Sequence, residues 1–352
     1  MLLGRRMSIG IDSDGRFINA VQLSRSRGQL QLEAAISITR ADNTIPLDSE
    51  EISRLTSILH RQGFQGNSVV LALPNETVMT SIFKMPNADN QENVNKRALS
   101  EMAASHQCSA SAIEASWWNL PEANTAQAPG YIMAVACRSE LAHAAVNLFE
   151  AAGMVVRAID VKPCALARAC SPLLAGSDEV TAILNIGWGF AEMVIVQNEI
   201  VIFERTLVET NLNQLHMSLM AKYSLEAPVI DQLIAEIGCQ LNEGENAETT
   251  QTDLAVALRK QIADYVDRLS SELSASISYA TQEYDRKPVT RLLVTGEGSV
   301  IPGIAERMSC KLKFKVQIVR PLDVVGGSEQ TVIDCNQPNM LTAVGLASHP
   351  EG

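Results

Sequence analysis

The chain has 352 residues, of which 46% are hydrophobic and 19% charged, and its formal net charge is -12 at pH 7. A chain of this length and composition can bury a large core and is long enough to form two lobes. The acidic charge argues against nucleic-acid binding, because neutralising phosphates requires a basic surface. The seven cysteines contain no CxxC pair and the five histidines no HExxH motif, so neither a disulfide framework nor a zinc site is indicated.

The sequence contains no run that approaches the roughly 20 apolar residues of a membrane-spanning helix. The basic cluster Arg5-Arg6 does not begin a signal peptide, because Asp12 and Asp14 interrupt the apolar residues after it. These two arginines could touch anionic lipid, but two charges supply little binding energy. We therefore expect a cytosolic protein without a membrane span of its own.

Two stretches of similar pattern, 8–23 and 181–196, each predict a β-hairpin. The first (SIGIDSDGRFINAVQL) reaches Asp12 and turns through 13–15, and the second (TAILNIGWGFAEMVIV) turns through 185–189. Glycine and small polar residues give both turns their backbone freedom. Two similar hairpins about half a chain apart suggest a duplicated fold in which one copy opens each lobe. Turns that face each other across a cleft could hold phosphates through converging backbone N–H groups.

Between the hairpins, the pattern predicts the rest of a first lobe that is interrupted by a small module. The first lobe, expected at 7–77 and 154–175, adds strands at 29–40, 68–73 and 155–161 and helices at 49–63 and 164–174. Ser49 is the expected N-cap of the first of these helices. The α+β module at 78–153 has strands at 78–85, 115–120 and 131–137 and helices at 90–104 and 139–152.

Two adjacent tryptophans, Trp117 and Trp118, lie in a predicted strand of this module. Neighbouring residues of a strand point to opposite faces, so we expect one ring in the core and the other exposed. The exposed ring could contact a partner.

The second hairpin opens a second lobe, expected at 178–337 with a helical insert at 212–285. Its further elements are a strand at 199–205, helices at 212–223, 228–238 and 253–284, a strand at 291–295, a glycine turn at 296–299, a helix at 302–312 and an edge strand at 314–319. The polar, acidic segment 242–252 is expected to be a surface loop. A terminal helix at 338–348 is expected to pack back on the first lobe.

Five segments carry a resemblance to a known family, namely GID at 10–12 with AVQL at 20–23, VVRAIDVKPCALARA at 155–169, NIG at 185–187, KYSL at 222–225 and VTGEGSVIPGI at 294–304. In this order they resemble the actin-like ATPase (ribonuclease H-like) fold, an α/β fold of two lobes. More narrowly, the chain resembles the PilM-type assembly proteins of type IV pili, relatives of the division protein FtsA. In that family a small module replaces the usual insertion of actin, which agrees with the position of 78–153.

The two hairpins depart from the pattern of that family. The first turn contains the additional carboxylate of Asp14, and Asn19 stands where the family has a lysine. A second carboxylate in a phosphate-binding turn would repel the ligand. The second hairpin has Asn185 in place of an aspartate, and Trp188 puts a large ring where phosphate would lie.

Three other positions also depart from the family pattern. Lys162 replaces the acidic residue that the fold uses near the attacking water, the family's glycine pair after 204–206 is absent, and Glu297 splits its Gly-Gly turn. Only Asp12 remains of the family carboxylates, and it is the only candidate metal ligand. Lys162 could neutralise a phosphate or form a structural ion pair with Asp12. The candidate nucleotide-binding residues are Asp12, Ser13, Asp14, Gly15, Asn19, Lys162, Asn185, Gly187, Trp188, Gly189, Gly296, Glu297 and Gly298.

The resemblance implies a cytoplasmic scaffold of a type IV pilus or type II secretion-like machinery, peripheral to the inner membrane, with weak or lost nucleotide hydrolysis. Its expected partner is a PilN-like bitopic membrane protein, whose cytosolic N-terminal tail lies between the first lobe and the module. ATP or ADP could be kept as a structural ligand, magnesium is not expected, and self-association is open. The competing hypothesis is a working ATPase that uses Asp12 with atypical ligands.

Overall fold

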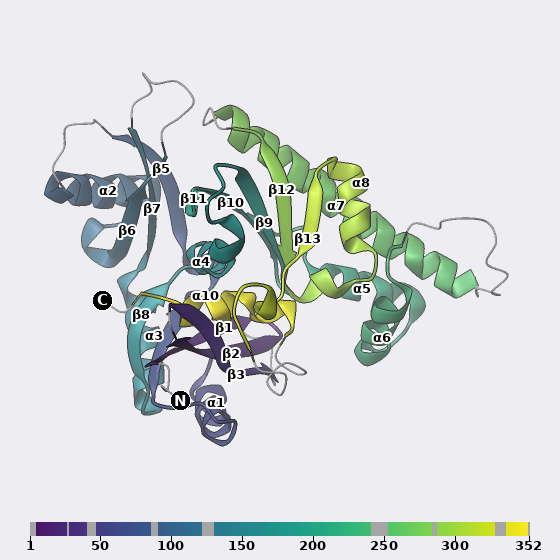
Figure 1. The fold of residues 1–352 in the computed structure, drawn as a ribbon, viewed down its shortest axis with the longest axis horizontal. Coiled ribbons are helices and arrows are strands. Elements are labelled where there is room, and N and C mark those ends of the chain that lie inside the picture. The colour runs from purple at the N-terminus through teal and green to yellow at the C-terminus, as the bar shows by residue number, and fades with distance from the viewer. Residues whose placement is uncertain are drawn as a thin grey trace.

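The structure is a computed structural model that describes residues 5–26, 28–40, 47–85, 91–121, 130–240, 253–283, 287–327 and 336–350. It contains two five-stranded sheets and one three-stranded sheet, with helices between and around them (Figure 1). The expected acidic loop at 242–252 lies outside the described residues. Among the described helices, none is long and apolar enough to cross a membrane.

The first sheet has the strand order β3-β2-β1-β4-β8. Its strands are β1 (Arg5–Asp14), β2 (Phe17–Ser26), β3 (Gln29–Thr39), β4 (Ser68–Ala72) and β8 (Val155–Asp160). Strands β1 and β2 pair as far as Asp14 and Phe17, so the turn consists of Gly15 and Arg16 and lies slightly later than the expected 13–15. Gly15 has a φ of +27°, which favours glycine.

Two helices cover the outer face of this sheet, α1 (Ser49–Arg61) and α3 (Ser139–Ala151). Their apolar sides join Ile9, Ile11 and Ile18 in one buried cluster. The N-cap of α1 is Asp48, whose carboxylate accepts a hydrogen bond from the Glu51 amide at 2.8 Å, and not the expected Ser49. Both residue types cap helices well, so their order alone does not decide between them.

The second sheet repeats the plan of the first, with the order β11-β10-β9-β12-β13. Its strands are β9 (Val180–Ile186), β10 (Ala191–Gln197), β11 (Ile200–Leu207), β12 (Val289–Thr295) and β13 (Lys315–Ile318). In each sheet the first strand pairs antiparallel with the second and parallel with a later one. The expected duplication of the hairpins is therefore confirmed.

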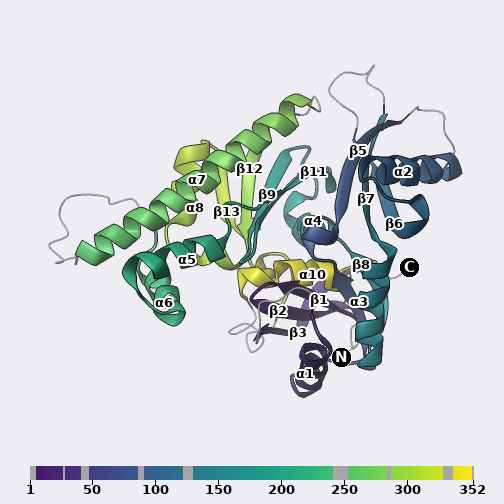
Figure 2. The same ribbon diagram turned by 180° about the vertical axis from the view of Figure 1, so that it is seen from behind.

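Helices lie on both sides of the second sheet. On the sheet itself lie α4 (Lys162–Leu174), α7 (Asp253–Glu283) and α8 (Ile304–Leu312), whereas α5 (Leu212–Tyr223) and α6 (Ala227–Ile237) pack against α7. Short 3-10 turns lie at Asn75–Thr77, Ala110–Ala112, Glu297–Val300, Pro321–Asp323 and Pro338–Met340. Figures 1 and 2 show α10 (Leu341–Ala347) between the two large sheets, beside α4. Ala165 of α4, Val70 of β4 and Leu346 of α10 are buried together there.

The three-stranded module has the order β5-β7-β6, with α2 (Gln91–Ser105) packed on it. Its strands are β5 (Met79–Met85), β6 (Ile113–Asn119) and β7 (Gly130–Arg138). Both tryptophans of β6 are half-buried, so the expected exposed ring is absent. The indole of Trp117 donates to Asn95, and that of Trp118 donates to the Val201 carbonyl of β11 at 2.7 Å. Trp118 thus joins the module to the second lobe.

Candidate functional site

The turns of the two hairpins contact each other between the lobes. A Cβ atom added to Gly15 would lie 3.2 Å from Cδ1 of Trp188, which belongs to the β9–β10 turn. The guanidinium of Arg16 lies over the Trp188 ring, 4.7 Å from its centroid. The Trp188 ring also makes a T-shaped contact with His216, with ring centroids 4.7 Å apart. The sequence predicted that these two turns face each other across a cleft. In the structure, side chains of the protein itself lie between them.

Arg16 is the centre of an ion-pair network that crosses between the lobes. Its guanidinium contacts both carboxylate oxygens of Asp231 on α6, with Nη1 3.0 Å from Oδ1. The same Nη1 donates to Glu297 at 2.9 Å. The hydrogen bond with Asp231 is the main cause of the raised pKa of Arg16. We call Arg16, Asp231, Glu297 and Trp188 the interlobe clasp.

Asp12 and Lys162 form a buried ion pair. Lys162 Nζ lies 3.0 Å from Asp12 Oδ1, and the two side chains are 2% and 3% exposed. The same Nζ donates to the Ser13 carbonyl at 3.0 Å. Of the two alternatives for Lys162, the structure therefore contains the ion pair with Asp12. Lys162 reaches Asp12 because it is the first residue of α4, two residues beyond the end of β8.

Glu192 is a buried carboxyl at this site that the sequence comparison missed. It lies on β10 opposite Asn185, and Asn75 donates a hydrogen bond to it at 2.9 Å from the first lobe. Burial raises the pKa of Glu192 to about 8. The group is therefore largely protonated at pH 7 and adds little negative charge beside Asp12. The available signal was a single acidic residue in the otherwise apolar strand AEMVIV.

His216 and Asp231 are two further residues that no sequence motif indicated. His216 is 3% exposed, and its Nε2 lies 3.4 Å from Asp231 Oδ1. Burial lowers the pKa of His216, while the nearby Asp231 carboxylate opposes this effect. His216 lies on α5, where its ring contacts Trp188, and Asp231 lies on α6.

The amides at the start of α5 are already bonded within the chain. The Leu212 amide donates to the Gly187 carbonyl at 3.2 Å and the Asn213 amide to the Trp188 carbonyl at 3.0 Å. Asn211 caps the helix by accepting from the Gln214 amide at 2.8 Å. A helix N-terminus can bind anions only through free amides. These three bonds therefore remove that way of binding phosphate here.

The glycine turn at 296–298 packs against the end of β9. A Cβ atom on Gly296 would lie 2.3 Å from Asn185 Oδ1, and one on Gly298 would lie 2.3 Å from Cγ2 of Ile186. These glycines permit a close backbone approach that a larger residue would prevent. The turn is thus held on the second lobe at the position where Glu297 meets Arg16.

The remaining predicted residues have less specific positions. Asn19 bonds Asn339, with its Nδ2 donating to the Asn339 carbonyl at 3.1 Å, and lies outside the clasp. The Gly187 amide donates a hydrogen bond to the Phe190 carbonyl of the same turn at 3.1 Å. A Cβ atom on Gly189 would meet nothing within 4 Å. The side chain of Asp14 lies outside the part of the chain that the structure describes.

Metal binding has little support from the described residues. They include no group of three or more His, Cys, Asp or Glu side chains that could hold an ion. Asp12 pairs with Lys162, and Asp231 and Glu297 pair with Arg16. A magnesium ion prefers several oxygen ligands and bound water in an octahedral arrangement. The carboxylates of Asp12, Asp231 and Glu297 instead pair with the basic side chains of Lys162 and Arg16.

Comparisons with known proteins agree with this architecture. A structure entitled "PilM-PilN type IV pilus biogenesis complex" has a TM-score of 0.79 and 17% identity, with 97% of each chain covered. Ethanolamine utilization protein EutJ from Carboxydothermus hydrogenoformans has a TM-score of 0.52 and 12% identity, covering 98% of this chain and 90% of that one. MreB 5 of Spiroplasma citri, bound to AMPPNP, has a TM-score of 0.50 and 12% identity, covering 91% and 92%.

These identities are low, so the structural likenesses show the fold and confirm the expected actin-like ATPase architecture. No curated protein sequence matches the chain. The family model described as "Type IV pilus assembly protein PilM" matches residues 10–349. Because this match spans nearly the whole chain, the protein belongs to the type IV pilus assembly protein PilM family.

Proposed function

We propose that the protein is a scaffold on the cytoplasmic side of the inner membrane in a type IV pilus machinery. In this proposal it holds the cytosolic N-terminal tail of a PilN-like bitopic membrane protein and hydrolyses nucleotide weakly or not at all. Membership of the PilM family and the likeness to a PilM-PilN complex support the pathway and the partner. The observation that carries the proposal is an apolar groove between the first lobe and the three-stranded module.

The groove has a volume of about 420 Å³ and lies between β8 of the first lobe and β6, β7 and α3. Its apolar lining residues are Leu73, Ala115, Val135, Ala136, Cys137, Ala142, Val146, Val156, Ala158, Ile159 and Val161. Charged side chains, those of Glu114, Arg157 and Asp160, also line it. An apolar segment with a few polar groups, such as a short peptide, fits this lining.

Two sheet edges border the groove. β8 ends the order of the first sheet, and β6 ends that of the module. Edge strands keep backbone N–H and C=O groups available for a further strand. An extended peptide could therefore bond to the backbone along one of these edges while its side chains contact the apolar lining.

We expect a charge placed in the groove to weaken binding of the tail. Val146 is a half-buried residue of α3 that lines the groove, and Val146→Asp would leave a carboxylate against the bound peptide. A buried, unpaired polar group costs about 1–3 kcal/mol, so the dissociation constant should rise about tenfold or more. The measurement is calorimetric titration, without nucleotide, of a synthetic peptide with the tail sequence of the bitopic protein encoded beside this chain.

The matched control is Val256→Asp, because Val256 also lies on a helix, α7, and is 54% exposed. This variant should bind the peptide as the unchanged protein does. If the unchanged protein shows no heat of binding with the peptide, the proposal is wrong. Equal affinity of the Val146→Asp variant would place the tail elsewhere.

The interlobe clasp supports a scaffold that works without nucleotide. We expect Arg16→Ala to lower the free energy of unfolding by about 1–2 kcal/mol, because it removes two partly buried ion pairs and a cation–π contact. Emission of Trp188 should also change when the guanidinium leaves its ring. Denaturant unfolding followed by tryptophan fluorescence measures both effects.

Arg97→Ala is the control for Arg16→Ala. Arg97 pairs with Glu101 across one helical turn, both side chains being more than two-fifths exposed. Its removal should cost no more than about 0.5 kcal/mol. A phosphate-release assay on the unchanged protein tests the competing hypothesis. Steady ATP turnover that Asp12→Ala abolishes would show that the protein is a working ATPase.

A further inference from the structure

Glu192 joins the two lobes through a buried hydrogen bond. It lies on β10 of the second lobe and is 1% exposed. Its Oε1 atom accepts at 2.9 Å from Nδ2 of Asn75, which follows β4 in the first lobe. The other oxygen, Oε2, is buried and has no hydrogen-bond partner among the described residues. Because one lobe supplies the carboxyl and the other its partner, separation of the lobes would expose the carboxyl to water.

The surroundings of Glu192 do not favour a negative charge. Burial is the main cause of the raised pKa of Glu192, and Glu204 of β11 and Asp12 of β1 raise it further, whereas Lys162 of α4 lowers it. Lys162 Nζ, however, already lies 3.0 Å from Asp12 Oδ1. Cys164 of α4 is neutral at pH 7, because burial raises its pKa to about 12. Glu192, once ionised, would therefore share one lysine with Asp12.

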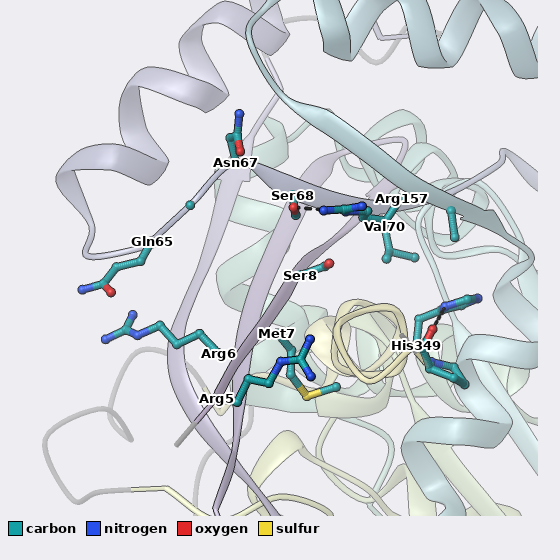
Figure 3. Close-up of a pocket in the computed structure, with 13 residues that line it drawn as sticks. Arg5, Arg6, Met7, Ser8, Gln65, Asn67, Ser68, Val70, Arg157 and His349 are labelled. Atoms are coloured by element: carbon teal, nitrogen blue, oxygen red, sulfur yellow. Dashed lines mark hydrogen bonds between the residues drawn. The ribbon is translucent and has the colours of Figure 1, made fainter. Parts of the chain in front are cut away.

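The two ends of β1 differ in how well water screens a charge. Figure 3 shows a hollow of about 980 Å³ at the start of β1, where Arg5 and Arg157 are exposed to solvent. Near the other end of β1, Asp12 is 2% exposed and Glu192 1%. Charges interact more strongly in a dry interior than at a hydrated surface. A change of charge on Glu192 is therefore felt by the contact between the lobes.

We propose that Glu192 is a proton-sensitive latch between the two lobes. When the carboxyl is protonated, it accepts the hydrogen bond of Asn75 without placing a charge in the contact. Loss of the proton puts a second buried anion near Asp12, and water can hydrate that anion only when the lobes separate. The closed arrangement is therefore favoured by the proton and weakened by its loss.

The direction of the pH dependence follows from the pKa of Glu192 in the two arrangements. Burial raises this pKa to about 8 with the lobes closed, whereas a carboxyl in water has a pKa of about 4.3. The stabilisation of the closed arrangement is thus complete below the lower pKa and is lost as the pH rises through the higher one. The closed-to-open ratio should fall about ninefold from pH 6 to 7, about fivefold from pH 7 to 8 and about twofold from pH 8 to 9.

Hydrogen exchange of backbone amides, followed by mass spectrometry on the full chain, tests the latch. The change is Glu192→Gln, which keeps the oxygen that accepts from Asn75 but cannot ionise. Rates of the two proteins are compared at the same pH, so the intrinsic pH dependence of exchange cancels. At Thr77 and Val78, whose amides bond within the turn that carries Asn75, the rate of the unchanged protein relative to the variant should rise about ninefold from pH 6 to 7 and level off above pH 8.

Two controls accompany this comparison. Helix α1, on the outer face of the first sheet, should keep a constant relative rate at every pH. Glu140→Gln removes an exposed carboxyl of α3 and should exchange like the unchanged protein. Within the unchanged protein alone, the rate at Thr77 and Val78 relative to that of α1 should show the same ninefold rise, so the test does not depend on the folding of a variant.

Two outcomes would overturn the inference. A relative rate at Thr77 and Val78 that stays constant from pH 6 to 8 would mean that the proton on Glu192 does not control the contact between the lobes. An equal rise in α1 would mean that the buried carboxyl affects the stability of the whole fold and not the separation of the lobes.

Discussion

Replacing Lys162 by methionine should lower the free energy of unfolding by about 3–5 kcal/mol, because the change leaves the Asp12 carboxylate buried without its cation. The Ser13 carbonyl would also lose its bond from Nζ. Lys162 lies at the N-terminus of α4, where a positive charge is unfavourable, and removing it returns only about 0.3–1 kcal/mol. The loss of the ion pair therefore dominates, and denaturant unfolding at pH 7 measures the difference.

Two further variants separate the buried charge from other effects of the substitution. Asp12→Asn/Lys162→Met removes both charges and should recover much of the lost stability, because an ion pair replaced as a whole leaves no isolated buried charge. Lys287→Met removes a lysine paired with Asp178 at the surface, where the side chains are 45% and 68% exposed. It should cost less than about 1 kcal/mol. Equal losses from Lys162→Met and Lys287→Met would contradict the buried pair.

Adding one methyl group at Gly345 should destabilise the protein by about 3 kcal/mol or more. A Cβ atom there would lie 1.8 Å from the Ala165 carbonyl oxygen, which is part of the α4 backbone. A backbone oxygen cannot rotate away as a side chain can, so α10 and α4 would have to separate. Overpacking in a core costs about 1–3 kcal/mol, and a backbone clash belongs at or above the upper end. The measurement is the denaturant midpoint of Gly345→Ala, together with its soluble yield.

Gly189→Ala is the matched control for Gly345→Ala. A Cβ atom on Gly189 meets nothing within 4 Å, and its φ is not positive. The free energy of unfolding of the Gly189→Ala variant should stay within about 0.5 kcal/mol of that of the unchanged protein. A Gly345→Ala variant as stable as this control would mean that α10 does not pack against α4 as described.

Charged side chains of the chain itself fill the cleft between the two lobes, in the interlobe clasp and in the buried ion pair. Arg16 joins the first hairpin to α6 and to the glycine turn, and Lys162 neutralises Asp12. We infer that these contacts hold the two lobes together without a bound nucleotide. The Arg16→Ala and Lys162→Met variants test separate parts of this inference, because the first removes partly buried ion pairs and the second a fully buried one.

Local patterns in the sequence were sufficient to predict most strands and helices. The repeated pattern of apolar strands around a glycine-containing turn in 8–23 and 181–196 correctly predicted two similar hairpins, and the apolar stripe of 253–284 predicted the helix α7. Errors of one or two residues occurred at ends, such as the N-cap of α1 and the start of α4 at Lys162. Such ends depend on which of several suitable residues the neighbouring elements leave free.

The sequence by itself determined the periodicity of the elements and the family, because these properties reside in neighbouring residues and in motif positions. Only the tertiary structure decided which charges meet. Arg16 and Asp231 are 215 residues apart, and no motif contains Asp231. Lys162 had two open alternatives until α4 was placed beside β1. Ion pairs of this kind depend on how whole sheets and helices pack, and that packing carries no local signal in the chain.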